Sequence, residues 1–417
     1  MKKYFLFLIT VLILFGSCKN KTTIIPQQTE FEQVAKFELP ENAVPIIYHH
    51  SIYIPGNADS IPGNFLLDTG ANLLFLDSIF YANNSFPKFK IRKGKLFGAG
   101  SDGSQDISII EDPVSFSFKN NSNNYPQTSV TPLKLISGDI IDGLIGKDGF
   151  TNTILEINYL HEYIMLHNKL SSIDTSDYVK INMKLVKTQL LVPVTIQIND
   201  TISIQGDFIL DTGCTEGTIL TSSAASKYDL TNNIANKVQF YSKHIGFSGA
   251  STACFFRANS IEIGGFKLDK VTMGYSEDKS GALAQNDFIG IVGNGVLERF
   301  DVIIDFINND LYLKPNQNYS NPFNFSKLGF DYTDRSITMN GWVVNGLYKN
   351  SNAEIAGLKI DDKIIYVNGI DIHQLPYKEQ IELWKKLDRA TLTILRDGEE
   401  IIIEFDLDYV GQEFIEI

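Results

Sequence analysis

Two segments of the chain repeat one another, and this duplication constrains the fold more than any other feature. Residues 63–70, GNFLLDTG, recur at 206–213 as GDFILDTG, with six of the eight positions identical. A second pair of matched segments follows at 142–146 and 289–293, so that Gly143 lies 75 residues after Asp68 and Gly290 lies 79 residues after Asp211. This spacing predicts a duplicated lobe of about 130 residues and argues against a short-period solenoid.

Both lobes are expected to be mainly β. Their apolar runs are rich in β-branched and aromatic residues and are separated by Gly, Asn and Asp, which is typical of strands and turns. We place the first lobe at 41–168 and the second at 186–315, and each closes with a pair of strands, at 154–166 and 300–313. Neither lobe shows a long amphipathic helix, and a short helix is expected near 222–228.

Each repeat ends in an Asp that follows a run of apolar residues. A buried carboxylate is costly unless it is paired or hydrogen-bonded. If the repeats face each other across a pseudo-twofold axis, Asp68 and Asp211 meet, share a proton and titrate as a pair. One carboxylate then acts as general base towards a water molecule, while the other, protonated, polarises a peptide carbonyl. This chemistry hydrolyses a peptide bond without a metal, a cofactor or a covalent intermediate.

The residues after each Asp suit the same arrangement. Gly70 and Gly213 allow a tight turn and a close approach of the backbone. The hydroxyls of Thr69 and Thr212 can tie the two loops together. These loops, with the segment at 290–305, resemble those of aspartic proteases of the retropepsin–pepsin type. The resemblance covers roughly residues 41–315 and implies two pseudo-symmetric β-barrel lobes, with both catalytic Asp residues in one chain and the site complete in a monomer.

Two features depart from the pepsin pattern. Ala71 and Cys214 follow the glycines where pepsins usually carry Ser or Thr, and Ala71 suits the retropepsin pattern better than Cys214 does. No Tyr stands clearly in a pepsin-like flap. The segments 97–103 and 246–250 are the candidates for mobile covers over the substrate, and the alternative is that both are plain β-turns. Their candidate substrate-contacting residues are Phe97, Gly98, Gly100, Phe247 and Gly249.

Two other functions remain open for the duplicated lobes. One is a protein that keeps the bilobal cleft and binds peptides without cutting them. The other is a two-carboxylate glycosidase, which requires its acid and its base in dissimilar environments, whereas matched loops predict similar ones.

The remaining Cys and His residues give weaker signals. Cys214 and Cys254 are expected to be two independent thiols, and an oxidising compartment would also permit a bond between them. The His residues at 49–50, 161 and 167 lack partners at metal-ligand spacing, so we expect surface or strand positions and no metal site.

A polar linker after Pro315 leads to a third module, at 325–410. Residues 350–369, NSNAEIAGLKIDDKIIYVNG, resemble a PDZ domain in content and order, and 376–387 is typical of an amphipathic helix. The resemblance implies an α+β fold that takes up an extended peptide C-terminus as an added strand. The implied contacts are the carboxylate loop and the groove helix, with Leu328, Gly329, Phe330, Tyr377 and Ile381. The alternative is a module that packs on the lobes and binds no free peptide.

The N-terminus resembles a bacterial lipoprotein signal. Two lysines precede a short apolar run, and the ending LFGSC resembles a lipobox, in which Cys18 is acylated after residues 1–17 are removed. Residues 18–40 then form a tether, and the protein is expected outside the cytoplasm on a membrane surface. An ordinary secretory signal with a chance Cys is the alternative.

Composition excludes several classes of function. The 417 residues are 43% hydrophobic with a net charge of −13, so the chain is neither largely disordered nor suited to nucleic acids. Three Cys are too few for a disulfide-dense scaffold. The sequence therefore predicts a membrane-anchored aspartic endopeptidase with an appended PDZ module and a peptide or protein substrate.

Overall fold

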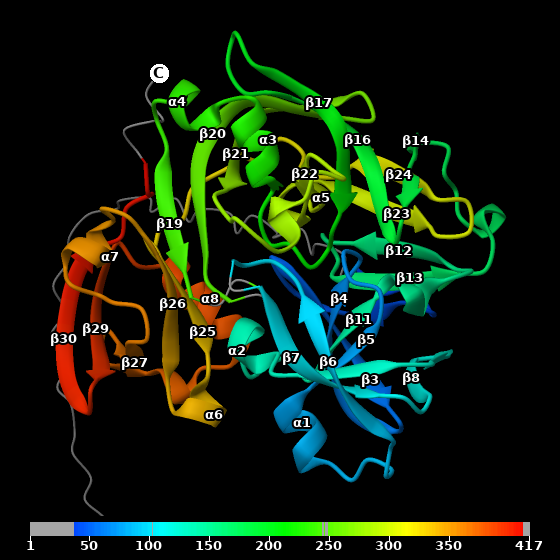
Figure 1. Cartoon of the computed structure of the whole chain (residues 1–417), viewed down its shortest axis with the longest axis horizontal. Helices are drawn as coiled ribbons and strands as arrows, with labels where there is room; N and C mark the ends of the chain where they lie inside the picture. Colours follow the sequence, from blue (N-terminus) through cyan, green and yellow to red (C-terminus); the bar gives the residue numbers. More distant parts are fainter. Residues whose placement is uncertain (1–36, 102, 244–245, 247–248, 412–417) are drawn as a thin grey trace, which may run out of the picture. The chain divides into compact units, whose positions relative to one another are not determined.

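The structure is a computed structural model, and it describes residues 37–101, 103–243, 246 and 249–411. By its internal contacts the chain divides after Glu38, and we describe the unit that begins at Leu39. The predicted signal peptide, most of the predicted tether, Cys18 and Phe247 lie outside the described residues. The described part is mainly β, as the sequence predicts (Figure 1).

The first lobe is built on one large sheet. Its central strand β4 pairs in parallel with β11 and antiparallel with β3, and β11 continues to β5. Short helices follow β5 and β10. The strands are β2 (Ile47–His49), β3 (Ser51–Ala58), β4 (Ile61–Asp68), β5 (Leu74–Asp77), β6 (Ile91–Phe97), β7 (Ser104–Ile110), β8 (Val114–Phe118), β9 (Asn121–Tyr125), β10 (Thr128–Thr131) and β11 (Gly143–Gly146), and the helices are α1 (Ser78–Asn83) and α2 (Lys134–Ser137).

The second lobe repeats this arrangement. Its β17 pairs in parallel with β22, and β22 continues to β18, which matches β4, β11 and β5 of the first lobe. The helix predicted near 222–228 forms as α3. The strands are β15 (Lys184–Val186), β16 (Gln189–Gln197), β17 (Ser203–Leu210), β18 (Thr218–Leu220), β19 (Val238–Ser242), β20 (Ser251–Ile263), β21 (Phe266–Ser276) and β22 (Gly290–Val292), and the helices are α3 (Ser222–Lys227), α4 (Leu230–Asn233) and α5 (Asn294–Leu297).

The closing strand pairs of the two lobes join in one sheet. β12 of the first lobe pairs with β23 of the second over five residues, from Ile154 opposite Asp305 to Asn158 opposite Asp301. Leu155 and Ile157 of β12 and Val302 and Ile304 of β23 belong to a core shared by both lobes. The members of this sheet are β1 (Val44–Pro45), β12 (Ile154–Asn158), β13 (Tyr163–His167), β14 (Val179–Asn182), β23 (Phe300–Asp305) and β24 (Asp310–Pro315). The shared sheet fixes the two lobes against each other.

The third module has its own core, which includes both tryptophans of the chain, Trp342 and Trp384. Its strands are β25 (Phe330–Asp334), β26 (Trp342–Tyr348), β27 (Lys363–Val367), β28 (Ile370–Asp371), β29 (Arg389–Arg396) and β30 (Glu399–Asp406), and its helices are α6 (Ser336–Met339), α7 (Asn352–Ile355) and α8 (Tyr377–Lys385). This order of elements agrees with the predicted α+β module. None of the helices in the described residues is long and apolar enough to cross a membrane.

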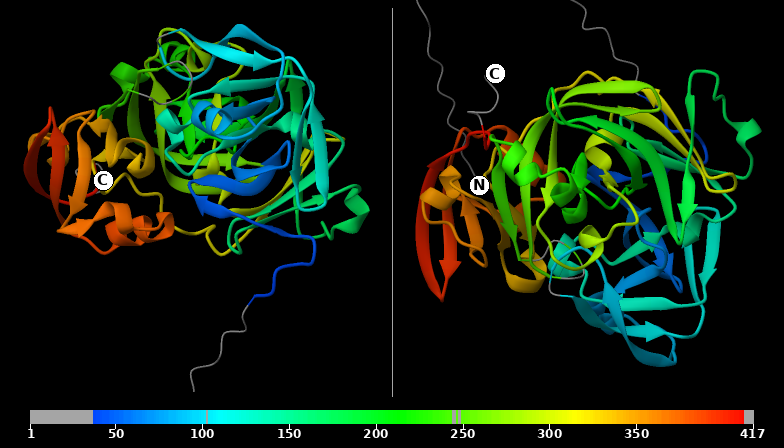
Figure 2. Two further views of the ribbon diagram at one scale, coloured as in Figure 1. Left: turned by 90° about the horizontal axis from the view of Figure 1, so that it is seen from below. Right: turned by 45° about the horizontal axis from the view of Figure 1, so that its top comes forward.

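The module continues the sheet of the second lobe. The end of β26 pairs antiparallel with β19, and the views in Figure 2 show the orange strands of the module beside the green strands of the lobe. Two further backbone hydrogen bonds flank this pairing, from Lys243 N to Asn345 O (3.0 Å) and from Lys349 N to Gln239 O (2.8 Å). The rings of Phe240 and Tyr348 pack across the junction with centroids 4.6 Å apart.

Candidate active site

The two Asp-Thr-Gly segments lie at equivalent places in the two lobes. Asp68 ends β4 opposite Gly146 of β11, and Asp211 directly follows β17, with its N–H donating to Val292 O of β22 (3.0 Å). The residues before each Asp are buried, which anchors both loops to the core of their lobe. The duplicated sequence therefore produces a duplicated loop geometry.

The two carboxyl groups meet between the lobes and are hydrogen-bonded to one another. Each carboxyl occupies the space left by the glycine of the opposite loop. A Cβ on Gly70 would lie 2.6 Å from the carboxyl carbon of Asp211, and a Cβ on Gly213 would lie 2.5 Å from that of Asp68. The absence of a side chain at both glycines is therefore what allows the carboxyls to approach.

The two threonines bind each loop to the other. Thr69 Oγ1 donates to Leu210 O (2.7 Å) and accepts from Thr212 N (3.0 Å). The second threonine reciprocates, because Thr212 Oγ1 donates to Leu67 O (2.9 Å) and accepts from Thr69 N (3.1 Å). Both side chains are fully buried. The predicted tie between the loops is thus present in these contacts.

Removing one hydroxyl should destabilise the junction of the lobes. We expect Thr69→Ala and Thr212→Ala each to lower the free energy of unfolding by about 2 kcal/mol, because each leaves a buried N–H and a buried carbonyl unpaired. Thr69→Ser and Thr212→Ser keep the hydroxyl and should lose less than half of that. Chemical denaturation followed by far-UV circular dichroism measures the difference, and equal losses for Ser and Ala would refute the role of the hydroxyl.

Burial and mutual proximity change the acidity of the pair. Burial, together with the charge of Asp211, raises the pKa of Asp68 well above its ordinary value. Burial also raises the pKa of Asp211. Backbone amides favour the ionised forms, since Ala71 N donates to Asp68 Oδ1 (2.9 Å) and Gly213 N to Asp211 Oδ1 (2.8 Å). The pair therefore holds one proton under conditions where an isolated Asp holds none.

Sequence reasoning did not identify Asn294, whose buried side-chain amide contacts the second Asp-Thr-Gly loop. Asn294 Nδ2 donates to Thr212 O and to His50 O, both at 2.7 Å, and its Oδ1 accepts from Tyr159 Oη at 2.9 Å. A further amide contacts the first loop, where Gln189 Nε2 donates to Gly70 O (3.0 Å). Gln189 stands in no motif, whereas Asn294 lies in the segment 290–305 that carries the resemblance but has no role assigned to it there.

Each candidate cover falls between two paired antiparallel strands, and we call its described residues a hairpin tip. The segment 97–103 joins β6 to β7, and 246–250 falls between β19 and β20. The first tip is hydrogen-bonded to the second lobe, because Ser101 N donates to Ala250 O and Ala282 N donates to Gly98 O, both at 2.8 Å. The two tips therefore meet, with Ala99 beside Gly246.

The residues predicted to bind a peptide lie on β25, in the two residues before it and on α8. Phe330 is fully buried in the module core and Ile381 is half-buried. The carbonyl of Gly329, in the predicted carboxylate loop, accepts from Ser351 Oγ and from Tyr348 N. Tyr377 packs instead against the first lobe, with its ring 6.2 Å from those of His49 and Tyr53.

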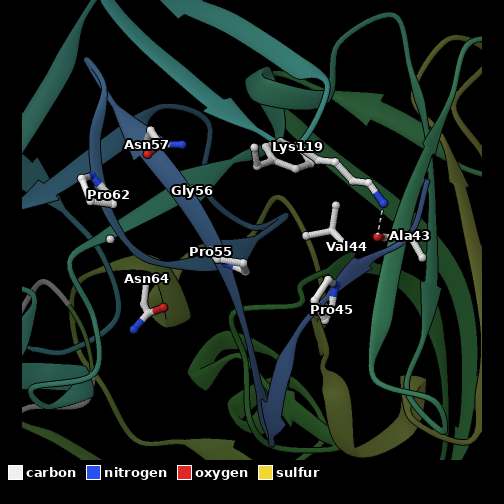
Figure 3. A pocket seen from close by; sticks show the side chains of 11 residues that line it. Ala43, Val44, Pro45, Pro55, Gly56, Asn57, Pro62, Asn64 and Lys119 are labelled. Carbon is white, nitrogen blue, oxygen red and sulfur yellow. Dashed lines mark hydrogen bonds between the residues drawn. The ribbon is translucent and has the colours of Figure 1, made fainter. Parts of the chain in front are cut away.

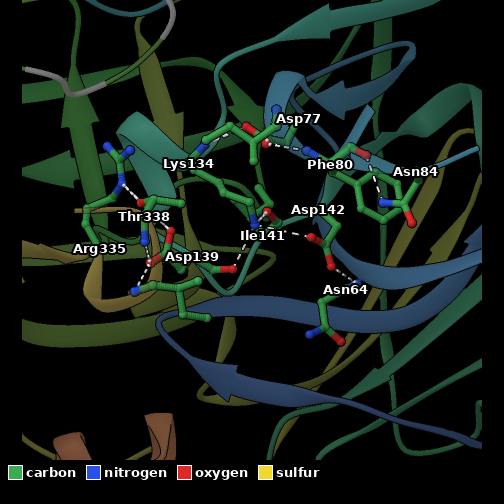
Figure 4. A network of polar contacts seen from close by, with 12 residues as sticks. Asn64, Asp77, Phe80, Asn84, Lys134, Asp139, Ile141, Asp142, Arg335 and Thr338 are labelled. Carbon is green, nitrogen blue, oxygen red and sulfur yellow. Dashed lines mark hydrogen bonds and ion pairs between the residues drawn. The ribbon is translucent and has the colours of Figure 1, made fainter. Parts of the chain in front are cut away.

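The far end of β25 is already in contact with the first lobe. Asp139 N donates to Asp334 O (2.7 Å), and the Asp139 carboxylate accepts from the N–H groups of Ile337 and Thr338 and from Thr338 Oγ1 (Figure 4). Lys134 holds this segment through the carbonyls of Asp139 and Ile141. A peptide added along β25 would therefore have to stop before Asp334.

The Cys and His residues do not form a metal site in the part of the chain that the structure describes. Cys214 and Cys254 are both free thiols. Burial and the charge of Asp211 raise the pKa of the Cys214 thiol well above its ordinary value, so this unexpected residue stays neutral beside the pair. His167 does have a carboxylate partner, since its Nε2 lies 2.8 Å from Glu156 Oε2 on the neighbouring strand.

A separate pocket lies on the first lobe. Its volume is about 620 Å³, and its lining includes Val44, Pro55, Pro62 and Lys119, whose Nζ donates to Ala43 O (Figure 3). None of its lining residues belongs to the two Asp-Thr-Gly loops. We therefore assign the chemistry to the paired loops and not to this pocket.

Family models match the second lobe and the C-terminal module of the chain. Residues 192–295, in the second lobe, match the family described as aspartyl protease, and residues 323–395 match the PDZ domain. The aspartic proteinase from Irpex lacteus is a similar solved structure, with a TM-score of 0.41 and 14% identity over 67% of this chain and 98% of that chain. No curated protein matches the chain. The two family matches show that the chain contains an aspartyl-protease-like domain and a PDZ domain, which imply peptide or protein ligands.

Proposed function

We propose that the protein is an aspartic endopeptidase that cuts peptide bonds with water activated by Asp68 and Asp211. The observation that carries the proposal is the pair itself, with two carboxyls joined by a hydrogen bond and each seated over the glycine of the opposite loop. The ionised carboxyl takes a proton from water as it attacks the peptide carbonyl, and the protonated carboxyl donates to the carbonyl oxygen. As the C–N bond of the tetrahedral intermediate breaks, its hydroxyl returns its proton to the carboxyl that donated it, and the proton taken from water passes to the leaving amine.

We place the substrate between the hairpin tips and the paired loops. Because the first tip reaches the second lobe at Ala250, an extended peptide must enter by displacing these contacts. One chain supplies both carboxyls, so we propose a catalytic monomer. We also propose that lipid on Cys18 holds it outside the cytoplasm at a membrane. A peptide-binding protein without activity is the alternative, and it shares the fold but predicts no cleavage.

The pH dependence of cleavage tests the shared proton. Activity requires one protonated and one ionised carboxyl, so kcat/KM should fall in acid, when both are protonated, and again as the pH rises above the upper apparent pKa, when both are ionised. Since both pKa values are raised from the ordinary 3.8, we expect cleavage to persist above pH 4. Digestion of an unfolded protein from pH 3 to 9 measures this profile, and a rate that keeps rising above pH 8 would contradict it.

A further inference from the structure

Asn294 connects the second catalytic loop to the first lobe. Its side chain is fully buried, and its two Nδ2 hydrogens are both used, one on Thr212 O beside Asp211 and one on His50 O. Its Oδ1 is fixed by the hydroxyl of Tyr159. Because every polar group of this amide is occupied, the position of the His50 carbonyl and that of the loop at Asp211 depend on each other.

The turn that presents the His50 carbonyl is held by side-chain packing. It joins β2 to β3, and His50 has a φ of 56°, in the left-handed region that residues other than glycine rarely adopt. The imidazole rings of His49 and His50 lie with centroids 4.6 Å apart. Burial and the nearby His50 and Lys385 charges lower the pKa of His49 to about 3, so this ring is neutral and packs as an aromatic group.

The PDZ domain contacts this turn through the start of α8. The ring of Tyr377 meets His49 and Tyr53 edge-on, at interplanar angles of 72° and 80°, and its hydroxyl is hydrogen-bonded to Tyr53. The next residue, Lys378, pairs with Glu162 Oε2 at 2.6 Å. The backbone carbonyl of Glu162 in turn accepts a hydrogen bond from the N–H of Ile46 (2.9 Å), the residue directly before β2.

We propose that Tyr377 is a positioning residue for peptide hydrolysis, acting through the His49–His50 turn and Asn294 on the catalytic loop at Asp211. The connection runs from the Tyr377 ring to the His49 ring, along the backbone from His49 to the His50 carbonyl, and through the Asn294 amide from that carbonyl to the carbonyl of Thr212. The PDZ domain is then part of the catalytic unit. This inference rests on the proposed function, because it concerns the same pair of carboxyls.

The test compares Tyr377→Ala with Tyr366→Ala in the full chain. Tyr366 belongs to β27 of the same domain and is 39% exposed, so it serves as a matched control. We expect Tyr377→Ala to lower kcat about 10-fold, with KM within about twofold, and to move the midpoints of the pH profile, since the loop that donates amides to Asp211 shifts. Tyr377→Phe keeps the ring contacts and should stay within about threefold of the wild type.

Two further measurements separate positioning from loss of structure. Both tryptophans lie in the PDZ domain, so their fluorescence reports its folding, and it should be unchanged in Tyr377→Ala. Partial unfolding would lower the amplitude of the pH profile without moving its midpoints. Adding Tyr377→Ala to Asn294→Ala should cost little beyond Asn294→Ala alone, because both changes interrupt the same connection.

The outcomes distinguish this inference from the proposed function. If the wild type cleaves and Tyr377→Ala has the kcat and pH midpoints of Tyr366→Ala, the positioning role is refuted and the peptidase remains. If the loss is confined to KM, Tyr377 contacts substrate and the proposed connection to Asp211 is wrong. If the wild type cleaves nothing between pH 3 and pH 9, the proposed function itself fails.

Discussion

Asp68→Asn and Asp211→Asn should each lower kcat/KM for peptide cleavage by about 10³-fold or more. An amide cannot take a proton from water or share one with the remaining carboxyl, so each change removes the acid–base function of the whole pair. Both variants should fold, because the side chains keep their shape and the threonine contacts between the loops do not involve the carboxyls.

The matched control for these variants is Asp207→Asn. Asp207 lies on β17, four residues before Asp211, and its carboxylate pairs with Lys184 (2.8 Å) at the surface. We expect this variant to keep the wild-type kcat/KM within about twofold, since surface ion pairs contribute little. A comparable loss in Asp207→Asn would mean that the effect comes from charge or folding and not from the catalytic pair.

Gly70→Ala and Gly213→Ala should also remove most of the activity, by about 10²-fold or more. The added Cβ would lie 2.6 or 2.5 Å from the carboxyl carbon of the opposite Asp, so the carboxyls must move apart, and displacement on the order of 1 Å is costly in a catalytic site. The two changes should have similar effects, because the loops are equivalent.

Gly217→Ala is the control for the glycine variants. Gly217 lies four residues after Gly213 in the same loop, and a Cβ there would meet its nearest neighbour at an ordinary 3.5 Å. We expect near wild-type activity in the same peptide assay. Full activity in Gly70→Ala or Gly213→Ala would show that the close approach of the carboxyls is not required.

The duplicated site was predictable because its signals are local and repeated. Each Asp-Thr-Gly follows an apolar strand and precedes a Gly-containing partner strand, and the sequence carries this pattern twice. The PDZ domain was also predictable from a local signal, because its characteristic segment at 350–369 forms α7 and β27 in the expected order. The predicted helix at 376–387 forms as α8, shorter by one residue at its start and two at its end.

The remaining contacts depend on packing between distant segments and leave no local signal. Asn294 meets His50 across 244 positions, and β19 pairs with β26 across about 100. Strands such as β12 and β23 are predictable one by one, but their pairing into a shared sheet depends on how the two lobes face each other. Tyr377 illustrates the consequence, because the resemblance assigns it to a peptide groove whereas its ring lies on His49 and Tyr53.

The most direct test of the account is to incubate the wild type and Asp68→Asn with the same library of unstructured peptides and to identify new termini by mass spectrometry. The account predicts many cleaved peptides with the wild type at acidic to neutral pH and none with Asp68→Asn. Equal cleavage by the two proteins, or no cleavage by the wild type at any pH, would contradict the claim that Asp68 and Asp211 form a catalytic pair.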